Sequence, residues 1–376
     1  MYSERGISRR QLLKGSGAVA GAFLLERASS PIRRELPPLP EFKRPEQEQR
    51  VLVIPITDSA KPGFEIKPFV ADDLTEASGW DAYLNDVSNR FRRMSWGKID
   101  YQFAVRPWYV SPKKINPLDE DEIARLGDAS VRDVPDIASY QTKLYVTPYT
   151  RADAGGLGNL KGGRAWIFAE NLDDGPFWKN VIGHELGHTL GLPHVSFRNE
   201  RELTSYKPKG NDTEYAEDTL MGVSTENRIH RHSYSPPLEL TVPEKISLGL
   251  LDASAIQDVS TPGLYAIDEF SKGQGIGALR INKPNSNDRY YITTDINPKP
   301  ELSNNDLPYV LQALVWDEQL GHSVDLVSRG SRRIVDRVNG IVIESAGLKL
   351  TGGKDQDIFM AKHQAMVKVT FTKSYF

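Results

Sequence analysis

The stretch VIGHELGHTLGLPH, residues 181–194, holds three of the seven histidines in this chain of 376 residues. It also carries the end signals of a helix. An aspartate pair can cap the N-terminal side, Pro176 suits the first turn, and Gly191 with a nearby proline marks the end. We therefore predict a helix over residues 176–190.

The spacing of the histidines predicts a metal site. His184 and His188 are four residues apart, so a helix stacks them on one face, where both imidazoles can reach one cation. Gly191 can adopt the left-handed conformation that ends a helix and can turn His194 back as a third ligand. Zinc suits imidazole nitrogen, and three protein ligands leave the open position of a catalytic zinc.

Glu185 follows the first histidine directly and can reach a water held by the metal without being a ligand. Zinc lowers the pKa of such a water toward about 7, so Glu185 can act as the general base of peptide hydrolysis. The competing interpretation is a helix face whose histidines are satisfied by hydrogen bonds. An accidental match to the whole pattern is expected in on the order of one chain in a hundred thousand, which favours the metal site.

These residues match the extended zinc signature of the metzincin metallopeptidases. The stretch EYAEDTLMG, residues 214–222, resembles the methionine turn of gametolysin-like metallopeptidases, with Met221 as the methionine. A more distant similarity links the chain to peptidases of the immune inhibitor A type. The resemblance implies an α+β fold, in which a metzincin-like zinc peptidase domain has a twisted sheet and an active-site helix. Without the family context, Met221 could equally be an ordinary core residue.

The same resemblance implies an edge strand above the cleft that pairs with an extended substrate through main-chain hydrogen bonds. By analogy, the strand GRAWIF would supply it through Gly163, Arg164, Ala165 and Trp166. The glycine-rich stretch before it, AGGLGNLKGG, is predicted to be a loop.

The group that stabilises the transition state is left open. Several metzincin families have a tyrosine two residues after the methionine, where this chain has Val223. Tyr215 and Tyr234 are the candidate stabilisers, with His230 and His232 as further alternatives. The two histidines fit a solvated loop better than a second metal site, since two ligands are few.

The N-terminal segment, residues 1–28, is predicted to be a signal peptide. The motif SRRQLLK, residues 8–14, resembles the twin-arginine export signal, and the apolar run after it is too short to span a bilayer. A disordered basic tail is the alternative. Export to the periplasm or the extracellular space is expected, with no stable membrane span unless the signal is retained. Residues 29–50 are predicted to form a Pro-rich linker.

Composition excludes some classes of protein. The formal net charge is -3 and no long basic run follows the N-terminus, so nucleic-acid binding is not expected. The chain has no cysteine, which excludes disulfides and latency through a cysteine on zinc.

The rest of the chain divides by pattern into two domains. Residues 51–255 carry the buried strand RVLVIPI, a helix at 80–94 and an alternating strand at 99–105, and form the predicted catalytic domain. Residues 256–376 show short alternating segments between turns, which predicts a β-sandwich-like C-terminal domain. The stretch GQGIGALR lacks the strand-to-helix context of a dinucleotide-binding loop.

We therefore expect an exported zinc-dependent metalloendopeptidase that acts on proteins or peptides, with one catalytic Zn²⁺. A calcium ion stays open as a second cofactor, although no residue pattern indicates one. Two alternatives remain: a surface-binding protein with a vestigial metal site, and a zinc amidase that acts on cell-wall peptides.

Overall fold

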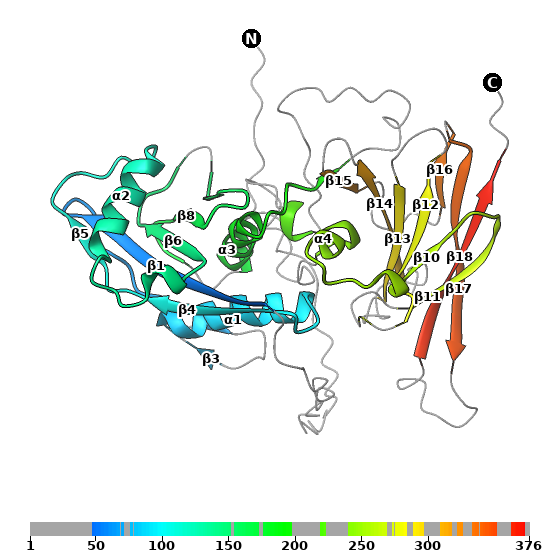
Figure 1. Cartoon of the computed structure of the whole chain (residues 1–376), viewed down its shortest axis with the longest axis horizontal. Helices are drawn as coiled ribbons and strands as arrows, with labels where there is room; N and C mark the ends of the chain where they lie inside the picture. The colour runs from blue at the N-terminus through cyan, green and yellow to red at the C-terminus, as the bar shows by residue number, and fades with distance from the viewer. Residues whose placement is uncertain are drawn as a thin grey trace, which may run out of the picture. The chain divides into compact units, whose positions relative to one another are not determined.

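A computed structural model describes residues 47–67, 69–70, 76–77, 79–151, 154–172, 176–197, 219–222, 240–268, 273, 275–283, 289–296, 309–317, 322–325, 333–337, 339–351 and 362–372 (Figure 1). Their α-helices are α1 (Gly79–Met94), α2 (Glu120–Ser130), α3 (Pro176–Thr189) and α4 (Val242–Ser247). The strands before residue 200 are β1 (Gln47–Asp58), β2 (Phe69–Val70), β3 (Glu76–Ala77), β4 (Ile99–Val105), β5 (Tyr109–Ser111), β6 (Thr142–Thr147), β7 (Gly156–Gly158), β8 (Arg164–Phe168) and β9 (Ser196–Phe197). The strands of the second half are β10 (Ile256–Asp258), β11 (Gly263–Asp268), β12 (Ala278–Asn282), β13 (Arg289–Ile296), β14 (Tyr309–Asp317), β15 (His322–Asp325), β16 (Arg333–Asp336), β17 (Ile341–Thr351) and β18 (Lys362–Phe371). The predicted mixture of helices and sheets is confirmed.

The first sheet has the strand order β4-β1-β6-β8-β7, and β5 pairs with the far end of β1. The pairs β1–β4, β1–β6 and β6–β8 are parallel, whereas β7 runs antiparallel to β8. Both faces of this sheet are covered. Val51 and Val53 of β1 share an apolar core with α1 and α3, while Leu52 and Ile54 point into a second core with α2. Burial on both faces explains why β1 is a continuous apolar run rather than an alternating one.

Local patterns predicted several of these elements, although β1 begins at Gln47, inside the segment 29–50 that the proline content indicates as a linker. α1 covers the helix expected at 80–94, and its residues Tyr83, Val87 and Phe91 are buried, as their spacing of four requires. Figure 1 shows α1 running along β4. Helix α2 was not predicted. Its signal was Asp119, whose side chain accepts the backbone N–H of Glu122 and so caps the helix.

The strands from β10 onward form two further sheets, one of which also includes β9. One has the order β10-β12-β13-β14-β15-β9 and the other the order β11-β18-β17-β16. Side chains of both enter one apolar cluster, including Ile281 and Ile292 from the first of them and Ile343 from the second. In β18, Val367 and Val369 lie in that cluster while Lys368 is exposed, as the alternation predicts.

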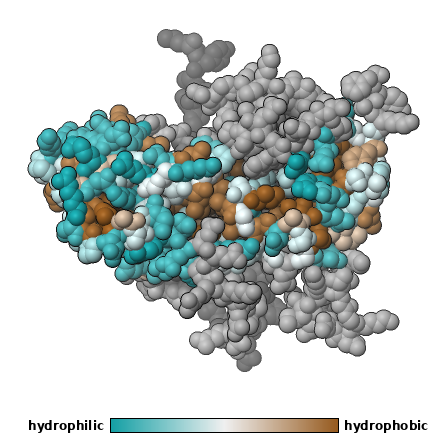
Figure 2. All heavy atoms as spheres, in the orientation of Figure 1, coloured by the Kyte–Doolittle hydropathy of each residue, from teal (hydrophilic) through white to brown (hydrophobic). Residues whose placement is uncertain are grey.

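The glycine loop GQGIGALR leads into strand β12, so the strand-to-helix turn of a dinucleotide site is not formed. None of the described helices has the length and apolar character needed to cross a bilayer. At the left of the view in Figure 2, where Figure 1 places α2 and β5, hydrophilic residues predominate on the surface. The domain boundary between residues 255 and 256 stays a prediction.

Candidate metal centre

Two of the predicted ligands lie on α3, and the third follows its end. Gly191 has a φ of +94°, the left-handed conformation expected of it. Its N–H donates to the His188 carbonyl at 2.8 Å, and the Leu192 N–H donates to the Gly187 carbonyl at 3.0 Å. These two bonds form a Schellman motif that ends the helix and redirects the chain. The turn brings His194 back toward the two helical histidines.

The three imidazoles converge on one point. One ring nitrogen from each lies within 4.8 Å of the others, and the Nε2 atoms of His188 and His194 are 3.0 Å apart. The His184 ring centroid lies 4.7 Å from that of His188 and 5.1 Å from that of His194. Zinc–nitrogen bonds of about 2.0–2.1 Å in tetrahedral geometry separate the nitrogens by roughly 3.3 Å. The separation of the His188 and His194 nitrogens is close to this value, so the donor set suits a metal ion such as zinc.

Backbone carbonyls fix the tautomers of the two helical histidines. His184 Nδ1 lies 2.9 Å from the Leu220 carbonyl oxygen, and His188 Nδ1 lies 2.8 Å from that of Leu192. A carbonyl oxygen only accepts, so each Nδ1 must carry the proton and donate it. Each Nε2 is then unprotonated and can offer its lone pair to a metal, and such a hydrogen bond from the other ring nitrogen is common among histidine ligands.

Burial keeps these rings neutral, the form that binds metal. It lowers the pKa of His184 to about 3, helped by the neighbouring His188 and His194 rings, and it also lowers the pKa of His188. At neutral pH a metal therefore has little proton to displace from either imidazole. His194 is partly exposed, so the cluster is open to solvent on its side.

Glu185 lies on the same helix and is buried. Burial raises the pKa of its carboxyl to about 8, because the charged form loses its hydration. A cation bound by the neighbouring histidines would favour the carboxylate and lower that pKa again. The side chain packs against β7: a Cβ added to Gly156 would lie 2.7 Å from Glu185 Cγ and from its Oε1.

Met221 is fully buried under α3. A Cβ added to Gly187 would lie 2.4 Å from the Met221 sulfur, so the thioether occupies the space that this glycine leaves. The Met221 carbonyl accepts the Val195 N–H at 3.0 Å, and the preceding Leu220 carbonyl accepts the His184 ring. The segment Leu220–Gly222 thus contacts the His184 ring and the backbone of the residue after His194.

The structure corrects the predicted edge strand. Arg164–Phe168, which contains Arg164, Ala165 and Trp166, pairs with β6 on one side and with β7 on the other, so it is internal to the sheet. Gly163 precedes it, with no room for a side chain beside the Gln141 carbonyl. The edge belongs to β7, formed from the glycine stretch that was predicted to be a loop. Strand patterns depend on side chains, which the glycines do not supply.

Helix α3 packs so closely against β7 that the strand has room only for glycine at the points of contact. A Cβ on Gly158 would lie 2.6 Å from the Glu185 carbonyl oxygen and 2.8 Å from His188 Cβ, whereas one on Gly155 would meet Trp178 at an ordinary 3.4 Å. We expect Gly158→Ala to destabilise the protein by about 1–3 kcal/mol and to weaken zinc binding, because β7 must move away from α3. Gly155→Ala, the matched control, should stay within about 0.5 kcal/mol of wild type. Thermal unfolding measures the stability of the two variants, and a zinc titration measures their affinity for the metal. Equal stability and equal zinc affinity in Gly158→Ala and Gly155→Ala would contradict the close packing of β7 against α3.

Tyr215, Val223, His230, His232 and Tyr234 lie outside the described residues. The candidate transition-state stabilisers among them stay predictions.

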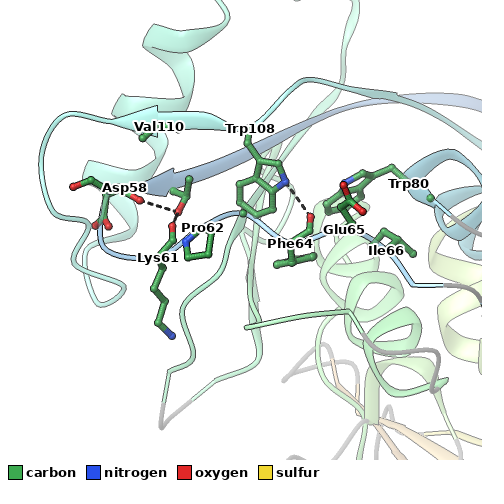
Figure 3. Close-up of a pocket in the computed structure, with 13 residues that line it drawn as sticks. Asp58, Lys61, Pro62, Phe64, Glu65, Ile66, Trp80, Trp108 and Val110 are labelled. Carbon is green, nitrogen blue, oxygen red and sulfur yellow. Dashed lines mark hydrogen bonds between the residues drawn. The ribbon is translucent and has the colours of Figure 1, made fainter.

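A separate hollow of about 790 Å³ lies at the C-terminal end of β1 (Figure 3). Phe64 meets the Trp108 ring edge-on at 5.1 Å, and Trp108 Nε1 donates to the Phe64 carbonyl at 3.1 Å. The Asp58 carboxylate on its wall accepts the Ile115 N–H and the Tyr149 hydroxyl. The three histidines are not among the residues that line it, so this hollow is not the metal centre.

Residues 6–25 match the model of the TAT (twin-arginine translocation) pathway signal sequence. The chain therefore carries an export signal, which directs it across the membrane to the periplasm or the extracellular space, as predicted. No curated protein matches the chain.

Solved structures give weak likenesses. Wild-type OgpA from Akkermansia muciniphila is 15% identical with a TM-score of 0.35, over 82% of this chain and 91% of that one. Metalloproteinase-II from Bacteroides fragilis is 14% identical with a TM-score of 0.30, over 56% of this chain and 54% of that one. The function proposed below therefore depends on the residues of this chain.

Proposed function

We propose that this chain is an exported zinc-dependent metalloendopeptidase. The observation that carries the proposal is the convergence of His184, His188 and His194, with the first two presenting Nε2 to a common point beside a buried glutamate. Three imidazole ligands and an open fourth position are typical of catalytic zinc.

Zinc, when bound by the three histidines, would lower the pKa of a water and polarise the substrate carbonyl. The step assigned to the protein is proton transfer. The Glu185 carboxylate takes a proton from the attacking water, whose oxygen forms a bond with the carbonyl carbon of the peptide. As the C–N bond breaks, Glu185 returns that proton to the leaving amine. The products are a carboxylic acid and an amine, and Glu185 ends as it began.

Substrate binding is assigned to β7 in place of the strand first expected. An extended peptide can add to the free edge of a sheet through main-chain hydrogen bonds. β7 is the end strand of the first sheet, and its glycines lie directly against Glu185 and His188. A peptide on β7 would therefore run beside the histidine cluster.

The family assignment belongs to this proposal. The zinc motif and the position of Met221 under α3 support a gametolysin-like member of the metzincin clan. The shared apolar cluster of the two C-terminal sheets supports a β-sandwich. Tyr215 and Tyr234 remain the candidates for stabilising the tetrahedral intermediate.

The test is proteolysis by the purified full-length protein with casein as substrate. We expect cleavage that a chelator abolishes and that one equivalent of zinc restores. Zinc binding without turnover on casein or on a peptide library would contradict the peptidase and favour a binding protein. Cleavage restricted to cell-wall peptides would identify a zinc amidase instead.

A further inference from the structure

The third predicted ligand leads directly into the sheet of the C-terminal half. Only Val195 separates His194 from β9. β9 pairs in parallel with β15, with Ser196 opposite Val324 and Phe197 opposite Asp325. β9 therefore forms the end strand of the six-stranded sheet that otherwise consists of β10 and β12–β15.

The third predicted ligand lies outside α3, unlike the other two. His184 and His188 are held by α3, and each ring donates to a backbone carbonyl. His194 follows the Schellman turn outside α3, so the backbone contacts of the residues after it help to set its position. Two backbone contacts hold the residues after it: the Val195 N–H on the Met221 carbonyl, and the pairing of β9 with β15.

The sheet that holds β9 is itself anchored. Ala278 of β12 and Tyr291 of β13 share an apolar cluster with Val242 of α4, and Trp96, after α1, packs against the same cluster. The Lys98 ammonium, just before β4, also donates to the Leu250 carbonyl at 2.8 Å, in the segment that joins α4 to β10. These contacts make the sheet a fixed support for β9.

We propose that β15 is a positioning element of the metal centre: by pairing with β9, it holds His194 where it can ligate zinc. The C-terminal half is then part of the metal site and not an accessory module. This inference rests on the zinc site of the proposed function, and it adds a requirement that the zinc motif does not contain.

The test compares two proline variants of the full-length protein. Val324→Pro removes a backbone N–H from β15, which lies between β14 and β9, and Gln257→Pro removes one from β10 at the edge of the sheet opposite β9. We expect the zinc dissociation constant, measured by competition with a chromophoric chelator, to rise about 10- to 100-fold in Val324→Pro. Gln257→Pro should stay near wild type. The visible spectrum of the cobalt-substituted protein should also change only in Val324→Pro, because it reports the coordination of the metal.

A pair of introduced cysteines tests the role of the β9–β15 pairing without a proline substitution. The chain has no cysteine, so Ser196→Cys with Val324→Cys gives a single defined pair. Opposed Cα atoms on neighbouring strands are about 5 Å apart, within the range of a disulfide. The oxidised protein should release zinc to a chelator several-fold more slowly than the reduced protein. Ser196→Cys with Gln257→Cys, which spans the whole sheet, should not cross-link.

Equal zinc affinity of folded Val324→Pro and wild type would overturn the positioning role. Equal rates of zinc release from the oxidised and reduced forms of the Ser196→Cys, Val324→Cys protein would also overturn the positioning role of β15. This second experiment replaces the first if Val324→Pro does not fold. Failure of the wild-type protein to bind zinc would instead contradict the proposed function.

Discussion

Replacing Glu185 by glutamine is expected to lower kcat for peptide cleavage by about 10³-fold while one zinc stays bound per chain. The amide has the shape of the carboxyl group but cannot take a proton from water. The three histidines are untouched, so zinc content should equal that of wild type. Casein cleavage and metal analysis on the same sample measure both.

A second measurement on Glu185→Gln is the pH dependence of the folding stability of the zinc-free protein. In the zinc-free protein, burial raises the pKa of Glu185 from 4.5 to about 8. Its contribution to folding stability is therefore complete below pH 4.5 and is lost as the pH rises through about 8. Glutamine does not titrate, so the zinc-free variant should lose less stability than wild type over this range. Full activity of a well-folded Glu185→Gln protein would exclude Glu185 as the base.

Replacing His188 by alanine is expected to weaken zinc binding directly, because the change removes one of the three predicted ligands. His188 Nε2 is 3.0 Å from His194 Nε2, and its Nδ1 is held by the Leu192 carbonyl, so its ring is set to supply one of the three ligand nitrogens. Structural zinc in small peptides is bound with about 10–16 kcal/mol by four ligands, roughly 3 kcal/mol for each. His188→Ala should therefore raise the zinc dissociation constant by about 10²- to 10³-fold and remove activity in parallel.

The matched control is His363→Ala. His363 belongs to β18 and is not one of the three converging histidines. It should bind zinc and cleave casein like wild type. Similar losses in both variants would show that His188 acts through general stability and not as a ligand.

The candidate site was predictable where chemistry follows local spacing. The four-residue interval of His184 and His188 is a helix interval, and Gly191 is a residue type that ends helices in the left-handed conformation. The apolar run of β1 is typical of a strand buried on both faces. In each case a few adjacent residues determine the geometry.

Other features depend on contacts that leave no such pattern. The partners of the histidine rings are the Leu220 and Leu192 carbonyls, and every residue type has a carbonyl. Two of the three residues of β7 are glycines, and their lack of a side chain lets α3 pack close to the strand. The pairing of β9 with β15 joins residues more than 120 positions apart in the sequence. Pairings between residues so far apart depend on how whole strands align in a sheet, and no short stretch of sequence determines that alignment.

The most direct test of the central claim is zinc K-edge X-ray absorption on the purified wild-type protein. The account predicts one zinc per chain with three imidazole nitrogens at about 2.0–2.1 Å and one further oxygen ligand. The nitrogen contribution should fall in His188→Ala and persist in Glu185→Gln. Absence of stoichiometric zinc, or a bound zinc without imidazole ligands, would contradict the account.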